Sequence, residues 1–192
     1  MTASAMRGPQ GVWIQNGKLF VADTQNNRVL IWNSIPTRNN QPADVVLGQP
    51  DFTTAPVINL INLNIPAAPN TMLSPTSVTS DGTRLFISMN AAGKVVMFDT
   101  SNPASPRVLK VLDLGASSGP HYIALTADEK RLVITDYFLN EDDFGKVHAE
   151  GDHKVHVASV LTNDLLLDLA FNLDFNVAFP TGPARPHGVA FK

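Results

Sequence analysis

The sequence has 192 residues, of which 44% are hydrophobic and 16% are charged, and its formal net charge is −3. This length and composition suit one globular domain with a buried core. The slightly acidic balance, without any run of Lys or Arg, lacks the basic footprint of a nucleic-acid or anionic-membrane binder, so we expect neither partner. Because there is no cysteine, disulfides, zinc–thiolate sites and thiol nucleophiles are excluded.

The cellular location is not determined by the sequence, since a cysteine-free chain suits either redox environment. No apolar run is long enough to cross a bilayer. The first residues, MTASAMRGPQ, lack the apolar core of a signal peptide, which favours the cytoplasm.

A repeated start signal organises the chain. Four segments begin with Pro, a variable residue, a small or aromatic residue and a β-branched residue, at 9–12, 75–78, 120–123 and 186–189. Each of the first three leads into short apolar runs, rich in Val, Ile, Leu and Phe and bounded by turn residues. Units of roughly 45 residues with four short strands are typical of β-propeller blades.

The sequence therefore predicts an all-β fold, a partial β-propeller of about three four-stranded blades plus one strand, in a single domain over 1–192. The expected bounds are 9–51 for the first blade, 75–115 for the second, 120–171 for the third and 186–192 for the start of a fourth. A β-sandwich made of the same strands is the alternative, although it would not require a recurring start signal. Insertions at 52–73 and 138–152 lengthen two repeats, and we expect the acidic second insertion to form a loop.

Three blades do not close a ring, because propellers have roughly four to eight. An open arc leaves strand edges and apolar surface between blades uncovered. We therefore expect the chain to be a fragment, to associate with another copy, or to pack less regularly than a propeller. A homodimer of two such arcs is one way to complete the ring.

Two stretches resemble known propeller families. Residues 8–55, with LFVADTQNNRVLIWNS and PADVVLGQPDF, resemble a bacterial NHL-repeat propeller. Residues 83–192 resemble the selenium-binding protein family, which includes methanethiol oxidases, through RLFISMNAAGKVVMFDTSNPASPRVLKVLDLG, SGPHYIALTADEKRLVITDYFLN and FPTGPARPHGVAFK. A hybrid of two propeller types, natural or made, is therefore an alternative to a fragment.

The second resemblance implies a central metal or ligand site built from histidines. The family's paired-histidine stretches lie towards its N-terminal part, whereas this chain has no histidine before His121. That departure separates the chain from an intact oxidase, and whether it is an enzyme stays open.

Two histidines occupy equivalent repeat positions. His121 and His187 each follow a starting proline, and their counterparts in the first two repeats are Gln10 and Thr76. The first strand of a propeller blade lines the central channel, so we expect these four side chains around one axis. Neutral imidazoles bind transition ions such as copper or zinc. The pair therefore predicts a shared metal site or polar-ligand site, with two histidines bonded only to water and backbone as the alternative.

Other candidates lie outside this ring. Arg185 could present an anion-binding fork at the mouth of the channel, or pair with a loop carboxylate. A second metal candidate is the set of carboxylates and imidazoles in the acidic insertion, although its spacing matches no known loop: Asp142, Asp143, His148, Glu150, Asp152 and His153. His156 alternates with valines in a strand, so we expect it to have a structural role.

Three functions follow as hypotheses. The first is a ligand- or metal-binding module with weak or absent catalysis, whose partner is a small ligand or a protein. The second is a copper-dependent enzyme of the methanethiol oxidase type, and the third is a protein–protein interaction scaffold. An oxidase should supply at least three convergent ligands, whereas the sequence supplies two, His121 and His187.

Overall fold

The computed structural model describes residues 1–54, 71–102, 104–141 and 145–191. Within these ranges the only helices are two short 3-10 turns, η1 (Thr24–Asn26) and η2 (Asn90–Ala92). None of the described residues belongs to a helix of the length and apolar character that a bilayer crossing requires. The fold is all-β, as the sequence predicted.

Two four-stranded antiparallel sheets come first, each with its strands in chain order. The first holds β1 (Pro9–Gln15), β2 (Lys18–Asp23), β3 (Arg28–Trp32) and β4 (Val45–Leu47). The second holds β5 (Pro75–Ser80), β6 (Arg84–Met89), β7 (Lys94–Asp99) and β8 (Arg107–Asp113). Short turns connect the first three strands of each of these sheets, which is the connection that adjacent antiparallel strands allow, whereas a longer connection over 33–44 leads to β4.

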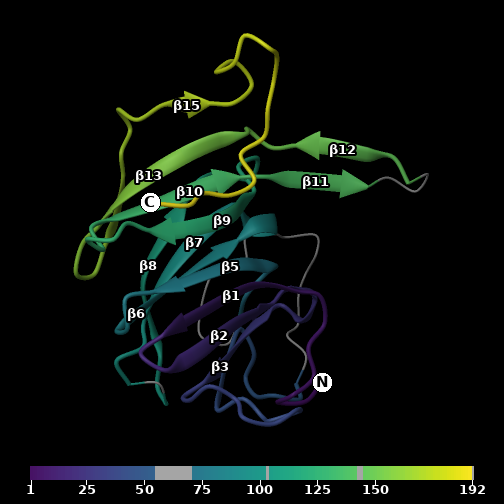
Figure 1. Cartoon of the computed structure of the whole chain (residues 1–192), viewed down its shortest axis with the longest axis vertical. Helices are drawn as coiled ribbons and strands as arrows, with labels where there is room; N and C mark the ends of the chain where they lie inside the picture. Colours follow the sequence, from purple (N-terminus) through teal and green to yellow (C-terminus); the bar gives the residue numbers. More distant parts are fainter. Residues whose placement is uncertain (55–70, 103, 142–144, 192) are drawn as a thin grey trace.

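The third sheet follows the same order but contains an insertion. Its strands are β9 (Pro120–Leu125), β10 (Arg131–Asp136), β13 (Lys154–Val160) and β14 (Leu165–Leu167), and the short β15 (Leu173–Asp174) also pairs with β13. Between β10 and β13 the chain leaves the sheet as an antiparallel hairpin of β11 (Phe138–Glu141) and β12 (Val147–Glu150), which projects from the body in Figure 1.

The hairpin corrects the expectation of a loop over 138–152. Short runs of strand-forming residues, beginning at Phe138 and at Val147, flank a turn that includes Gly145 with a positive φ of 77°. Such a pattern permits cross-strand pairing even in an acidic segment. Residues 142–144, and most of the first insertion, at 55–70, lie outside the described residues.

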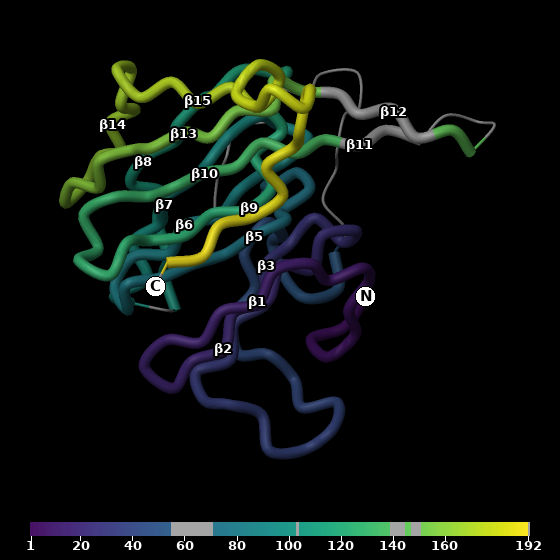
Figure 2. Tube along the Cα trace, turned by 45° about the horizontal axis from the view of Figure 1, so that its top comes forward, coloured from purple at the N-terminus to yellow at the C-terminus, as the bar shows by residue number. Residues whose placement is uncertain are grey.

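The three sheets stand one after another, with β5 between β1 and β9 (Figures 1 and 2). The middle sheet lies between the other two, and successive side chains of its strands point to opposite faces. Its strands therefore contribute to two cores. Leu85 and Ile87 join the core against the first sheet, whereas Phe86 joins the core against the third. This explains why the two central strands of that sheet, β6 and β7, consist mostly of apolar residues.

A buried ion pair fixes the first sheet to the N-terminal segment. The Arg28 guanidinium lies 2.7 Å from Asp23, and both side chains are fully buried. Arg28 also donates hydrogen bonds to the carbonyls of Thr2 and Ala5. The pair therefore holds structure, and because its remaining donors are satisfied it is not a candidate site.

The C-terminal segment differs from the expectation of a fourth first strand over 186–192. Residues 186–191 carry no strand and run alongside β9 (Figure 2). In the first three sheets, the opening strand pairs with the second strand of its own sheet. Among the described residues, no strand pairs with 186–191 in the way that β2, β6 and β10 pair with β1, β5 and β9.

A methyl group added where the inner strands approach each other closely should destabilise the protein. A Cβ added at Gly11 would lie 2.7 Å from the Thr76 carbonyl oxygen and 2.8 Å from the Ser77 Cα. We expect Gly11→Ala to cost about 1–3 kcal/mol of unfolding free energy by overpacking, measured by chemical denaturation. The matched control is Gly188→Ala at the equivalent position of the last repeat, where the nearest atoms are 3.8 Å away. Equal stability of Gly11→Ala and the wild type would contradict this packing.

Candidate functional site

The four equivalent positions of the repeat line one pocket. Gln10, Thr76, His121 and His187 surround an axial pocket of about 420 Å³, to which Trp13 and other residues of the inner strands contribute. We call this the axial pocket. The structure thus brings together, from four segments far apart in sequence, the side chains that the repeat placed around one axis.

The two histidines lie directly against each other. Their ring centroids are 4.8 Å apart with planes 33° apart. Tyr137 presents its ring edge-on to both, with centroid distances of 5.4 Å to His121 and 4.5 Å to His187. The three rings form one aromatic cluster at the end of β9 and β10, a geometry that aromatic pairs favour.

Tyr137 was not identified from the sequence. It follows Asp136, which pairs with Pro120 across the sheet, and its backbone N–H donates to the Gly119 carbonyl at 3.0 Å. The residue after the second strand therefore lies beside the start of the first strand. Because Asp136 pairs with Pro120, the residues that follow each of them, Tyr137 and His121, lie close together. This strand register is the signal from which Tyr137 could have been identified.

Hydrogen bonds from the second sheet hold the His121 backbone. Thr76 Oγ1 donates to the His121 carbonyl at 2.9 Å, and the Thr76 and Ser88 hydroxyl oxygens lie 3.0 Å apart. The Ile123 N–H donates to Ser77 Oγ at 3.3 Å. The Thr76 hydroxyl is therefore engaged by contacts within the protein.

The environment of His121 favours the neutral form of its ring. Burial lowers the pKa of His121 from its ordinary value, and repulsion from His187 lowers it further, while a hydrogen bond with the His187 backbone opposes the change. His121 Nδ1 is buried and has no hydrogen-bond partner. An unpaired buried nitrogen costs free energy, so it favours a ligand that can bond to it.

The other predicted residues do not join the axial pocket. Arg185 is exposed and is not among the residues that line the pocket. Buried His153 hydrogen-bonds instead through Nδ1 to Asn176 Oδ1 at 2.9 Å. In the acidic insertion, Asp142 and Asp143 lie outside the described residues, and for His148 and Glu150 only the backbone, in β12, is described.

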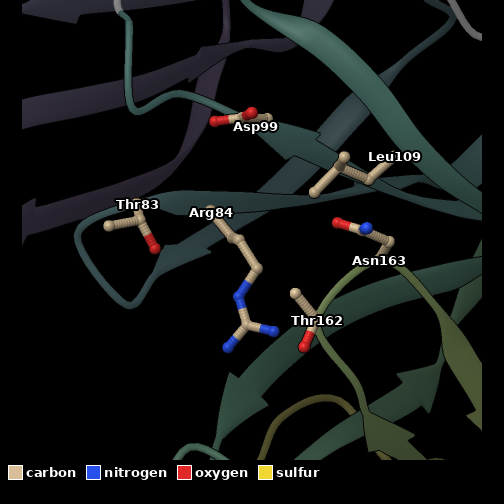
Figure 3. Close-up of a pocket in the computed structure, with 6 residues that line it drawn as sticks. All are labelled: Thr83, Arg84, Asp99, Leu109, Thr162 and Asn163. Atoms are coloured by element: carbon tan, nitrogen blue, oxygen red, sulfur yellow. The ribbon is translucent and has the colours of Figure 1, made fainter.

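A second hollow lies between the second and third sheets (Figure 3). It has a volume of about 350 Å³, and Arg84 extends into it towards Thr162. Its charged groups already have partners, since Arg84 pairs with Asp81 and Asp99 with Arg107. We therefore place no site in this hollow.

No known family model and no curated protein matches the sequence. The fold, however, matches solved structures. A putative 6-phosphogluconolactonase from Bacteroides uniformis aligns with a TM-score of 0.55 and 15% identity over 89% of this chain and 43% of that protein. A periplasmic gluconolactonase from Pseudomonas aeruginosa aligns with a TM-score of 0.56 and 16% identity over 94% of this chain and 46% of that protein.

The chain folds as part of a β-propeller. The three sheets and these neighbours together show this architecture, and at such low identity they show the fold alone. The chain spans less than half the length of either neighbour. Neither comparison shows the selenium-binding or NHL families, so those resemblances stay predictions.

The copper or zinc ion implied by the selenium-binding resemblance fits the axial pocket only in part. The adjacent imidazoles and the orphaned Nδ1 of His121 suit one shared ion. Among the described residues, no Asp, Glu or further His brings a third ligand atom to this pair. The pair therefore offers two of the three protein ligands that a catalytic metal site ordinarily has.

Truncating one histidine should change the titration of the other. We expect His187→Ala to raise the pKa of His121, because it removes a neighbouring charge and admits water to a buried ring. The measurement is the pH dependence of the His121 imidazole resonances by NMR. Arg185→Ala, outside the pocket, is the control. A His121 pKa that stays the same or falls in His187→Ala would contradict the described environment.

Proposed function

We propose that this propeller segment binds a small, uncharged polar molecule in the axial pocket. The convergence of Gln10, His121 and His187 on one pocket is the observation that carries the proposal. A volume of about 420 Å³ lies within the range of small-molecule sites, roughly 300–1,000 Å³.

The lining selects the chemical class. The Gln10 amide and the imidazoles of His121 and His187 offer hydrogen-bonding groups, whereas Trp13, Val78 and Tyr122 supply apolar surface. No Lys or Arg is among the lining residues, so the pocket lacks the cationic groups that bind phosphate. A ring with a hydroxylated edge and an apolar face, such as an unphosphorylated sugar lactone, suits this surface. The lactonase names of the neighbours support this choice of probe.

Binding, rather than turnover, is the proposed role. Neutral His121 could accept a proton from water near pH 7, as hydrolysis of a lactone requires. The lining residues include no carboxylate that would support a histidine base and no cation that would stabilise the oxyanion formed on attack. Lactone hydrolysis is therefore expected to be slow or absent in this chain.

Glucono-1,5-lactone is the probe that tests the proposal. We expect saturable binding by calorimetry, together with shifts in the His121 and His187 imidazole resonances. Gln10→Ala and His187→Ala should each weaken binding about tenfold or more, because each removes a hydrogen-bonding group from the pocket; tenfold corresponds to about 1.4 kcal/mol. Arg185→Ala should bind as the wild type does. Binding that is unaffected by both pocket variants, or no binding, would overturn the assignment.

A transition ion at His121 and His187 is the second candidate. The buried, unpartnered Nδ1 of His121 favours it, since a metal would satisfy that nitrogen. Elemental analysis of the purified protein, with His121→Ala and His187→Ala, tests this directly. One equivalent of copper or zinc that is lost in both variants supports the ion, whereas its persistence in either variant contradicts it.

We also propose that a second copy completes the ring. On β1, Val12 and Ile14 are 63% and 58% exposed, although Trp13 between them donates to the Ser80 carbonyl of the second sheet. On β5, by contrast, the equivalent of Val12 is Val78, which is buried in the core shared with the first sheet. Light scattering should give twice the monomer mass for the wild type and the monomer mass for Ile14→Lys. A wild-type monomer would contradict this association.

A further inference from the structure

A cluster of three side chains lies outside the axial pocket, where the β11–β12 hairpin leaves the third sheet. Asp136 ends β10, Asp152 lies between β12 and β13, and His156 lies within β13. One ligand atom from each side chain lies within 4.8 Å of the other two. The hairpin separates Asp136 from Asp152 in sequence, and its antiparallel pairing returns the chain to the same place.

The cluster has a buried member, Asp136, and is incompletely bonded. The Asp136 side chain has no exposed surface, and its Oδ2 lies 2.7 Å from His156 Nε2. Asp136 Oδ1 and Asp152 Oδ1 are both buried without a hydrogen-bond partner. Two carboxylates that meet away from water repel each other unless a proton or a cation lies between them.

We propose that Asp136, Asp152 and His156 bind a divalent transition cation, with Zn²⁺ as the ion that the donor set favours. Imidazole nitrogen and carboxylate oxygen are both ordinary zinc ligands, and three protein ligands leave a fourth position for water. Zinc bonds of about 2.0–2.2 Å place tetrahedral ligand atoms about 3.4 Å apart. The cluster is already within reach of that spacing, so side-chain rotations suffice to complete it.

The electrostatics of the cluster agree with this assignment. Burial and the neighbouring Asp152 together raise the pKa of Asp136 to about 7, against the opposing hydrogen bond from His156. A cation bound beside Asp136 would offset this penalty on its ionised form. The Lys154 ammonium lies 3.5 Å from Asp152 Oδ2, and 38% of the Lys154 side chain is exposed. This ion pair does not involve the buried Oδ1 atoms of Asp136 and Asp152, which stay without a hydrogen-bond partner.

The ion would join the two ends of the inserted hairpin to β13. It would also fix the position of Tyr137, the residue after Asp136, whose ring contacts both axial histidines. The cluster is thus a distinct site beside the axial pocket, and its occupancy should stiffen one wall of that pocket. If zinc binds the folded protein and not the unfolded chain, it also increases the free energy of unfolding.

Zinc titration of the whole chain tests the proposal. The protein to use carries His121→Ala and His187→Ala, so that the axial pair cannot contribute. We expect one equivalent of Zn²⁺ to shift the His156 imidazole resonances and to raise Tm. Asp136→Asn, Asp152→Asn and His156→Gln, made in the same background, should each weaken zinc binding at least tenfold. Asp128→Asn, in an exposed turn, is the matched control and should bind zinc as its parent does.

The outcomes separate the two sites. If zinc leaves His156 unchanged and does not raise Tm, the carboxylates share a proton only and the proposal is wrong. If the cluster variants bind zinc as tightly as their parent, the ion lies elsewhere and the proposal is also wrong. Asp152 and His156 are partly exposed, so Asp152→Asn and His156→Gln, which each keep a polar group, should still fold. These two variants test the proposal even if Asp136→Asn fails to fold.

Discussion

The close approach of the three inner strands around one axis is the constraint on which the structure depends. Gly11 leaves no room for a Cβ against the backbone of β5, and the Thr76 hydroxyl reaches across to the His121 carbonyl. Each contact joins one sheet to the next near the start of a Pro-led segment, at the third residue of the first repeat and at the second residue of the second repeat. Large residues at these positions would push the sheets apart, whereas small and hydroxyl-bearing residues let the backbones meet.

This approach creates the axial pocket and decides what it can hold. The second residue of each Pro-led segment lines the pocket, so a polar residue there becomes part of the lining. In the last two repeats that residue is histidine, and the ring centroids of His121 and His187 consequently lie 4.8 Å apart. Burial favours the neutral form of His121 by lowering its pKa, and its Nδ1 has no hydrogen-bond partner. The close approach of the inner strands therefore determines both the packing at the axis and the properties of His121 in the pocket.

The sequence predicted the parts of the fold that repeat. Recurrence of the Pro-led segment predicted the all-β architecture and the ring of Gln10, Thr76, His121 and His187, because equivalent positions of a repeat occupy equivalent places. It did not predict Tyr137, or the meeting of Asp136 with Asp152 and His156. Those contacts depend on strand register and on the return of an inserted hairpin, and a slip of one residue would send each side chain to the opposite face. The repeat also predicted a fourth opening strand, whereas residues 186–191 carry no strand.

The central claim is that segments 66 residues apart place His121 and His187 side by side at the axis, with Tyr137 edge-on to both. Nuclear Overhauser effects between the ring protons of these three residues measure that arrangement most directly. We predict cross-peaks between the two imidazoles and from each imidazole to the Tyr137 ring, because the centroids lie between 4.5 and 5.4 Å apart. Cross-peaks within each sheet but none between His121 and His187 would contradict the account.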